Sequence, residues 1–449
     1  MINLDIIRGV IKFKKKLRNF DFDHKRLTIY PKISDDNCYS YDCFNDDKDK
    51  GKFNYLVGKT DRNKNIFFID VEYCELDYND MYIAFPGAYC ISKYIIDDDS
   101  FSTKPIANVQ LTSTIITSLQ YNDIQLLKRD SGTKLFDNEI RNFFPLDNEI
   151  AFVETKIDHN SLNVNTSLII DYAKPKSLIT WYHECLKIIR TFRFLYNRKN
   201  VFFDSIDIEF YKNFDKHELV YNELVEYKMY YINKVNEFKY QNLSIVKDTI
   251  FNHFNDVYNL LKDKDFYFYY PENDKDNSYI DIKKFIVMCG TFEREFEETF
   301  SKSLEDINNT FNIVKKDIIS QLEVIQSNYD NHEKQEEVGN IIQIVERLSK
   351  SLASRLNYCY EQFEFVMSER FAYHCKTQNI NKCDFMQISR VFGNTRNKMV
   401  HTFSNIKFNN QVVVGYLMAR DLIYCMILKR ANFTDDEIKV MVKTVLEYT

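Results

Sequence analysis

The stretch Ser244–Leu261, SIVKDTIFNHFNDVYNLL, marks the place where the character of this sequence changes. Its apolar residues recur every three or four positions, which is the spacing of one face of an α-helix. Before this stretch apolar residues form short runs, and after it the helical spacing persists. The sequence therefore predicts an α+β chain, with a β-rich part followed by a helical part.

The β-rich part consists of short runs of Ile, Val, Phe and Tyr between clusters of Asp, Asn and Gly. Such runs favour β-strands because branched and aromatic side chains pack well on a pleated surface. The expected strands are Phe53–Val57, Ile66–Val71, Met81–Phe85, Gln110–Thr117, Ser167–Tyr172 and Val201–Phe210.

One helix is expected within this part. Pro175 suits the first position of a helix, and the apolar residues that follow have helical spacing: Leu178, Trp181, Leu186, Ile189 and Phe192. Leu219–Tyr231 fits a strand or a helix, and the polar segment Cys38–Lys52 is expected to loop out. We expect residues 1–243 to form a β-rich domain.

The helical part is expected to span residues 244–449 as a bundle. A Thr434-x-x-Glu437 capping box predicts the start of its last helix, and the polar segment Pro271–Ser278 predicts a loop. The expected helices are Ile245–Leu261, Ile280–Phe300, Ile313–Ile325, Val338–Phe365, Phe385–Phe403, Gln411–Leu428 and Asp435–Leu446.

Composition restricts the classes of function. The chain has 449 residues, which suits two domains, and a formal net charge of -6, which argues against a protein that coats nucleic acid non-specifically. Its longest apolar stretch, Val412–Leu428, is interrupted by Arg420 and Asp421, so we expect no membrane span and a cytoplasmic protein. The ten cysteines form no CxxC pair, so we expect reduced thiols, no structural metal and no cofactor.

The helix Phe385–Ser404 carries the candidate chemistry. Asp384 can cap it, with Gln387 placed for a capping box. At about 100° per residue, one side gathers the apolar residues that should face the bundle, Phe385, Ile388, Phe392, Met399 and Phe403. The other side gathers Arg390, Gly393, Asn397, His401 and Ser404, and Arg396 is expected at the border of the apolar stripe.

Gly393 costs roughly 1 kcal/mol relative to Ala inside a helix, which is tolerable where another helix approaches closely. A helix from a second subunit would fit there. Asn397 and His401 are i,i+4 neighbours, so the amide can orient the imidazole. Arg396 projects about 140° from His401 and would have to reach round the helix to share a ligand.

Between Phe385 and Arg420 the sequence has five Lys or Arg and no Asp or Glu. This is a local basic footprint, in which Arg390 and Lys398 are candidate RNA-binding residues. Cleavage of RNA without a metal requires a base, an acid and a cation for the developing phosphorane charge. Because one histidine cannot easily be both base and acid, two copies of His401 and Arg396 across a symmetric cleft predict a homodimer or a higher homo-oligomer.

Two other interpretations remain open at this point. His401 can be a satisfied polar histidine on a solvated helix face, with Arg396 merely edging the core. A metal nuclease would need converging carboxylates, and the two acidic runs, Asp97–Asp99 and Glu293-x-Glu295-x-Glu297-Glu298, have the spacing of a solvated loop and a solvated helix face.

The segment Thr395–His401, TRNKMVH, resembles the Arg-Asn-x3-His form of the signature of HEPN ribonucleases. Its context resembles the ApeA-like HEPN group: Phe285–Glu293 is similar to an apolar helix of that group that ends in Glu, and Arg347–Leu356 is similar to the next one. The first half is similar to the ApeA N-terminal domain in the order of its elements: the strand pair Phe53–Gly58 and Ile66–Asp70, the helix Ile179–Tyr196 and the return strand Val201–Ile208.

This resemblance implies a metal-independent endoribonuclease that acts in abortive-infection defence against bacteriophage. It assigns catalysis to Arg396, Asn397 and His401, with Glu293 as a supporting residue, and it gives the first half the role of sensing a phage-derived trigger or restraining the enzyme. Some HEPN domains lack activity. The alternative is therefore a non-catalytic HEPN dimerisation scaffold that binds a nucleic acid or a protein partner.

Overall fold

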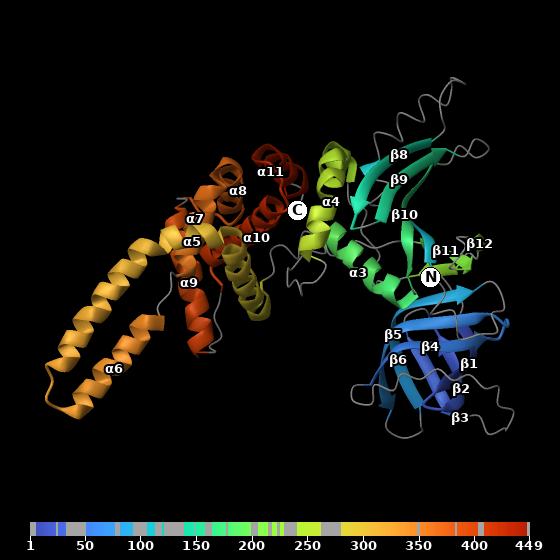
Figure 1. The fold of residues 1–449 in the computed structure, drawn as a ribbon, viewed down its shortest axis with the longest axis horizontal. Coiled ribbons are helices and arrows are strands. Elements are labelled where there is room, and N and C mark those ends of the chain that lie inside the picture. The colour runs from blue at the N-terminus through green and yellow to red at the C-terminus, as the bar shows by residue number, and fades with distance from the viewer. Residues whose placement is uncertain are drawn as a thin grey trace. The chain divides into compact units, whose positions relative to one another are not determined.

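A computed structural model of the chain contains two compact units, Met1–Lys262 and Asp263–Thr449, each described by itself (Figure 1). The residues that the structure describes are 6–23, 26–32, 51–76, 81–92, 106–112, 119–120, 139–147, 149–157, 164–176, 178–198, 205–213, 218–221, 225–228, 240–261, 280–347, 351–381, 384–402 and 408–446. The predicted loops at 38–50 and Pro271–Ser278, and the acidic run Asp97–Asp99, lie outside them.

The first unit begins with a closed antiparallel barrel. Its strands are β1 (Ile7–Phe13), β2 (Lys16–Phe22), β3 (Leu27–Lys32), β4 (Lys52–Thr60), β5 (Asn65–Leu76) and β6 (Met81–Ser92). They pair in the order β3-β2-β1-β4-β5-β6, and pairing between β3 and β6 closes the ring. Gly9 allows β1 to approach β4, because a Cβ at this position would overlap the backbone carbonyl of Lys59.

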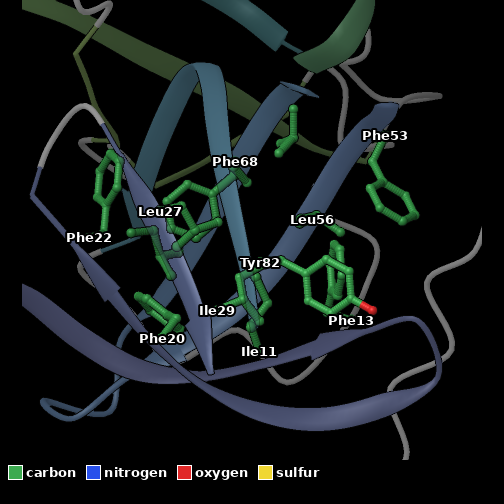
Figure 2. Close-up of a cluster of buried hydrophobic side chains, with 13 residues drawn as sticks. Ile11, Phe13, Phe20, Phe22, Leu27, Ile29, Phe53, Leu56, Phe68 and Tyr82 are labelled. Atoms are coloured by element: carbon green, nitrogen blue, oxygen red, sulfur yellow. The ribbon is translucent and has the colours of Figure 1, made fainter. Parts of the chain in front are cut away.

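Alternating side chains of these strands fill the barrel with one apolar cluster. Phe13, Phe20, Phe22 and Phe68 are buried, and the edge of the Phe20 ring meets the Phe68 ring at a centroid distance of 5.7 Å (Figure 2). Alternation with a period of two places every second residue of a strand on the inner face. The predicted strands Phe53–Val57, Ile66–Val71 and Met81–Phe85 are confirmed as parts of this barrel.

A second antiparallel layer continues from β6. Its strands are β7 (Ile106–Thr112), β8 (Glu139–Leu146), β9 (Glu149–Ile157), β10 (Val164–Lys176), β11 (Ser205–Asn213), β12 (Glu218–Tyr221) and β13 (Val225–Lys228). The order is β6-β13-β11-β7-β10-β9-β8, with β12 beside β11. The ambiguous segment Leu219–Tyr231 therefore contains strands, and the part of the predicted strand Val201–Phe210 that is described belongs to β11.

Two helices cover this layer, α3 (Leu178–Leu195) and α4 (Lys247–Leu261), the latter after a 3-10 segment, Tyr240–Val246. The prediction that Pro175 opens the helix was wrong, because Pro175 lies in β10. The ring of Phe254 in α4 packs on Phe192 of α3 at 4.9 Å, and Phe251 stacks on Phe144 of β8 at 5.0 Å. Helix α4 therefore belongs to the first unit, and the division falls later than the predicted residue 243.

The second unit is helical. Its elements are α5 (Ile282–Ser327), α6 (His332–Arg347), α7 (Leu352–Gln362), α8 (Glu364–Thr377), α9 (Phe385–Thr402), α10 (Asn410–Arg430), α11 (Asp435–Met441) and a π-helical turn, Val442–Leu446. The capping box of Thr434 and Glu437 is confirmed at the start of α11. A β-rich part followed by a helical part is thus the observed architecture.

Two helix predictions in this unit differ from the structure. The predicted helix Ile280–Phe300 ends where α5 has a kink, at the non-helical dihedral angles of Phe300, but the second segment of α5 is longer than the predicted Ile313–Ile325. The predicted helix Val338–Phe365 is divided among α6, α7 and the first two residues of α8, and most of α8 was not predicted. The α7–α8 junction at Phe363 has no proline or glycine, so no local signal marks it.

Helix α10 is the core of the second unit, in contact with α5, α8 and α9. It is long and apolar enough to cross a membrane, but 89% of its most apolar window is buried inside the protein. The interruption by Arg420 and Asp421, both buried, is satisfied within the unit as described below. A core helix is therefore a sufficient explanation for its composition.

Candidate active site

Helix α9 packs into the second unit along the predicted apolar stripe. Phe385, Ile388, Phe392 and Met399 are buried, whereas Phe403 lies outside the described residues. The Asp384 carboxylate accepts a hydrogen bond from the backbone N–H of Gln387 at 3.2 Å, which confirms the predicted N-terminal cap. The stripe fixes the rotation of α9 about its axis, and this rotation determines where its polar residues lie.

Gly393 faces a neighbouring helix of the same chain. A Cβ on Gly393 would lie 3.4 Å from the backbone nitrogen and 3.5 Å from the Cβ of Ala353 in α7. The expectation that this glycine is open to a second subunit was wrong, because α7 already occupies the position. Ser389, on the same side of α9, donates to the Asn357 side chain at 2.9 Å and completes this contact.

Arg396 bridges α9 and α5. Its Nη2 lies 3.3 Å from Oε2 of Glu293, and its Nη1 donates to Oδ1 of the neighbouring Asn397 at 3.3 Å. The side chain of Arg396 remains 34% exposed and that of Glu293 29% exposed. The structure thus brings together Arg396, Asn397 and Glu293. The Arg396 side chain lies toward Asn397 and remains partly exposed to solvent.

Cys289 lies one turn of α5 before Glu293, beneath this group. Burial raises the pKa of the Cys289 thiol well above its usual range; Glu293 acts in the same direction, and Arg396 opposes both. A thiol with a raised pKa stays protonated near neutral pH and is a poor nucleophile. The arrangement therefore offers a cation and a carboxylate, not a reactive cysteine.

A solvent-exposed polar strip runs along α9 beside this group. It contains Arg390, Asn394, Asn397 and Lys398, and α9 has no Asp or Glu. Position 401 continues the strip by helical spacing, in the last turn of α9, and the side chain of His401 lies outside the described residues, as does Ser404. The strip is positively charged, and the Arg396 side chain is joined to it by its hydrogen bond to Asn397.

A second Arg–His group in this unit was missed by the sequence interpretation. Asp421 of α10 is fully buried and accepts hydrogen bonds from Arg370 Nε at 3.0 Å and Nη2 at 2.9 Å, and it lies 2.8 Å from His374 Nε2. Arg420 contacts its other oxygen at 3.3 Å. The signal was present as an Arg-x3-His pair in one helix and an Arg-Asp pair inside an apolar helix.

Burial decides what this second group can do. The side chains of Arg370 and His374 are 6% and 5% exposed, so a polynucleotide cannot reach them. Burial lowers the pKa of His374, although its contact with Asp421 acts in the opposite direction. The group is a structural junction between α8 and α10, and Arg370 extends it by donating to the backbone carbonyl of Leu446 at 2.8 Å.

The acidic face of α5 is paired with cations. Glu295 is buried and contacts Arg430, and Glu298 lies 2.5 Å from the same guanidinium. The expectation of a solvated face was therefore wrong for Glu295, whereas Glu297 is exposed and pairs with Arg355 at 2.8 Å. Among the described residues, no group of three or more His, Cys, Asp or Glu could hold a metal ion. Five cysteines, Cys185, Cys289, Cys359, Cys375 and Cys425, are free and buried.

In three comparisons with known proteins, no family model, no curated protein and no solved structure matches the chain. The geometry of the site is therefore the basis for a functional proposal, together with the sequence resemblance described above.

Proposed function

We propose that the chain is a metal-independent RNA endonuclease of the HEPN type, with Arg396, Asn397 and His401 at its active site. The observation that carries the proposal is the placement of Arg396. An arginine that served only the core would be enclosed, like Arg370, whereas Arg396 has two polar partners and a side chain that is 34% exposed.

In this reaction the 2′-oxygen of a ribose attacks the adjacent phosphorus, and the bond from phosphorus to the 5′-oxygen breaks. A base takes the proton of the 2′-OH, and an acid returns a proton to the leaving 5′-oxygen. The products carry a 2′,3′-cyclic phosphate and a 5′-OH. His401 is proposed for proton transfer, because an imidazole exchanges protons near neutral pH, and Arg396 for the charge on phosphorus, because a guanidinium binds phosphate oxygens in pairs.

The supporting residues have distinct tasks in this proposal. Glu293 orients the Arg396 guanidinium across the α5–α9 contact. Asn397 lies between Arg396 and position 401 and can orient both. Arg390 and Lys398 are exposed cations on the same helix and are proposed to bind the RNA backbone.

The proposed active form is a homodimer or a higher homo-oligomer in which two α9 strips face one cleft. Two copies provide two imidazoles, one as base and one as acid. Two cationic strips repel one another unless an anion lies between them, so a phosphate backbone in the cleft would favour the pairing. Gly393 does not contribute to this contact, because α7 covers it.

The biological setting rests on the resemblance alone. It suggests abortive-infection defence against bacteriophage in the cytoplasm, with the β-rich unit sensing a phage-derived trigger or restraining the enzyme. No cofactor enters this proposal.

The test is cleavage of a labelled RNA by the purified chain in EDTA, with analysis of the product ends. We expect cyclic phosphate ends, and loss of cleavage in His401→Ala and in Arg396→Ala with the circular-dichroism spectrum unchanged. Unchanged cleavage in His401→Ala would refute the assignment. Binding of RNA without cleavage under any condition, weakened by Arg396→Ala, would instead indicate the non-catalytic scaffold.

His374→Gln is the matched control for the second Arg–His group. The glutamine amide can still donate to Asp421, so the fold should be retained. Because the His374 side chain is 5% exposed, we expect RNA cleavage to continue in this variant. Loss of cleavage in His374→Gln at unchanged stability would move the active site to the buried group.

A further inference from the structure

The outer part of α5 and the whole of α6 form a two-stranded helical hairpin. Figure 1 shows them side by side with no other helix of the unit along them. Near the tip, Gln326 Nε2 donates to the backbone carbonyl of Gln335 at 2.8 Å, which sets their register. Ile319 and Leu322 of α5 and Val338 of α6 are each at least partly buried, which assigns them to the inner side of the hairpin.

A second apolar stripe runs beside this inner contact on both helices. On α5 it contains Val314, Ile318 and Ile325, and on α6 it contains Ile341 and Ile344, all between 43% and 62% exposed. Glu337 of α6 is exposed at the same spacing, one turn nearer the tip. On each helix the stripe lies one residue before the inner stripe, a rotation of about 100°. Because the two helices are antiparallel, these rotations bring both stripes to the same face of the hairpin.

The opposite face of the hairpin is polar. At helical spacing it carries Asn312, Lys316, Glu323 and Ser327 on α5, all exposed, and Gln343 on α6. A hairpin that is apolar on one face and polar on the other has the pattern of half of a four-helix bundle. We call the exposed side with Val314, Ile318, Ile325, Ile341 and Ile344 the apolar hairpin face.

The size of this face indicates the width of its partner. Helix α6 has 16 residues, which is about 24 Å, and two adjacent helices are roughly 20 Å wide, so the strip measures roughly 500 Å² in flat projection. This area is near that of the largest apolar patch that monomers usually expose. Protruding side chains add to it, which brings it close to the roughly 600 Å² that each partner buries in a small specific interface. A single helix would cover half of the width; a second two-helix face covers all of it.

Charge argues for a second copy over an anionic partner. Residues 311–327 have a balanced set, Lys315, Lys316, Asp317 and Glu323. Helix α6 has four Glu against Lys334 and Arg347, so it would be repelled by RNA or by an acidic membrane. The balanced α5 segment can meet its own copy without net repulsion. Helix α6 also meets its own copy in an antiparallel pair of hairpins, where the end with Glu333 and Lys334 lies beside the end with Glu346 and Arg347, so that opposite charges can face one another.

Gln321 supplies the specific argument. It is exposed and lies on the stripe between Ile318 and Ile325, in the middle of the face. An amide carries both a donor and an acceptor, so it can pair with an identical amide across a two-fold axis. A single polar residue on an apolar seam also sets the register of helix pairing.

We propose that the apolar hairpin face is a self-association surface, on which two copies of the chain pack their hairpins, with tips reversed, into an antiparallel four-helix bundle. Helix α5 then lies against its own copy, and Gln321 meets Gln321 at the two-fold axis. This contact is separate from the α9 strip and does not depend on the proposed ribonuclease activity.

Cross-linking of the full-length chain tests the contact directly. Gln321→Cys should form a disulfide-linked dimer under mild oxidation, seen on a non-reducing gel. Glu323→Cys, two positions further and on the polar face, is the matched control and should cross-link at least about tenfold more slowly, because only residues held close have a high effective concentration. Equal rates for the two variants, or a wild-type chain that remains monomeric, would overturn the proposal.

Charge reversal identifies the partner. Gln321→Glu and Gln321→Lys should each weaken self-association by roughly tenfold or more, because each places like charges opposite one another in a buried face. Mixing the two variants should restore a mixed dimer in sedimentation velocity. Ser320→Glu, which adds the same charge away from the face, should have no effect. Failure of the mixture to associate would exclude the antiparallel pairing and leave the face to another protein or to another part of this chain.

Discussion

Replacing Asp421 by asparagine removes one negative charge from the middle of the helical unit and hardly changes the volume of the side chain. In the native protein this carboxylate compensates Arg370 and Arg420, which are buried with it. Its pKa lies far below the usual range, because the two guanidinium groups and His374 outweigh the effect of burial. The Asp421 carboxylate is therefore charged near neutral pH.

The expected loss of stability follows from this geometry. The asparagine side chain would keep hydrogen-bonding atoms in place, but the two buried guanidinium groups would lose the negative charge of Asp421. Removal of one partner from a buried ion pair costs about 3–5 kcal/mol. For a unit of the size of Asp263–Thr449, each kcal/mol lowers the melting temperature by about 2–4 °C, so the loss is roughly 6–20 °C.

The assay is thermal and urea unfolding followed by the helical circular-dichroism signal. Asp435→Asn is the matched control, because Asp435 pairs with Lys429 at 2.7 Å while its side chain is 61% exposed. Exposed pairs contribute less than about 1 kcal/mol. If Asp421→Asn lowered the midpoint no more than Asp435→Asn, the reasoning that a buried ionic junction holds α8 to α10 would be refuted.

Four further variants test packing, protonation and the candidate site. Gly415→Ala should destabilise the protein by about 1–3 kcal/mol, because the new Cβ would lie 2.9 Å from Phe392. Gly290→Ala should stabilise it by up to about 1 kcal/mol, because a Cβ at this position has no neighbour within 4 Å. Equal unfolding midpoints of the two variants in urea would contradict this reasoning. The pKa of His374 is lower in the folded protein than in the unfolded chain, so protonation of this imidazole favours unfolding as pH falls below about 6.5, its usual pKa. In His374→Gln the free energy of unfolding should therefore depend less on pH below that value. A slope equal to that of the wild type would show that the imidazole is not held neutral. Glu293→Gln should slow RNA cleavage in EDTA by roughly tenfold to a hundredfold, because the candidate catalytic arginine loses its orienting charge, at a cost in stability below about 1 kcal/mol for so exposed a pair. An unchanged rate would separate Glu293 from the reaction.

The sequence predicted the fold where the apolar pattern was strong. The dense apolar run Ile66–Val71 lies in a strand, and the stripe of α9 and the continuous apolar run of α10 lie in helices, as the pattern predicted. The kink of α5 at Phe300 coincides with the predicted end of the helix Ile280–Phe300. The sequence did not predict how segments join, because α4 joins the first unit through contacts with β8 and α3 that are distant in sequence.

The candidate site was predicted as a set of residue types on one helix, and the structure adds their neighbours. Helical spacing placed the buried stripe of α9 correctly, but not the role of Gly393, because the position of α7 depends on the tertiary fold. The pairing of Glu293 with Arg396 joins residues more than one hundred positions apart. Spacing along one helix carries no information about such a contact.

The two Arg–His groups of the helical unit show why spacing alone cannot identify an active site. Arg370 and His374 are one helical turn apart, which suits a shared ligand better than the separation of Arg396 and His401. Their ligand is already present, however, because α10 places Asp421 between them and closes the site. Arg396 meets a partly exposed carboxylate instead, and its own side chain stays 34% exposed. The distinction arises from which helix packs opposite, and it makes Arg396 the residue to test for phosphate chemistry and the buried pair the one to test for stability.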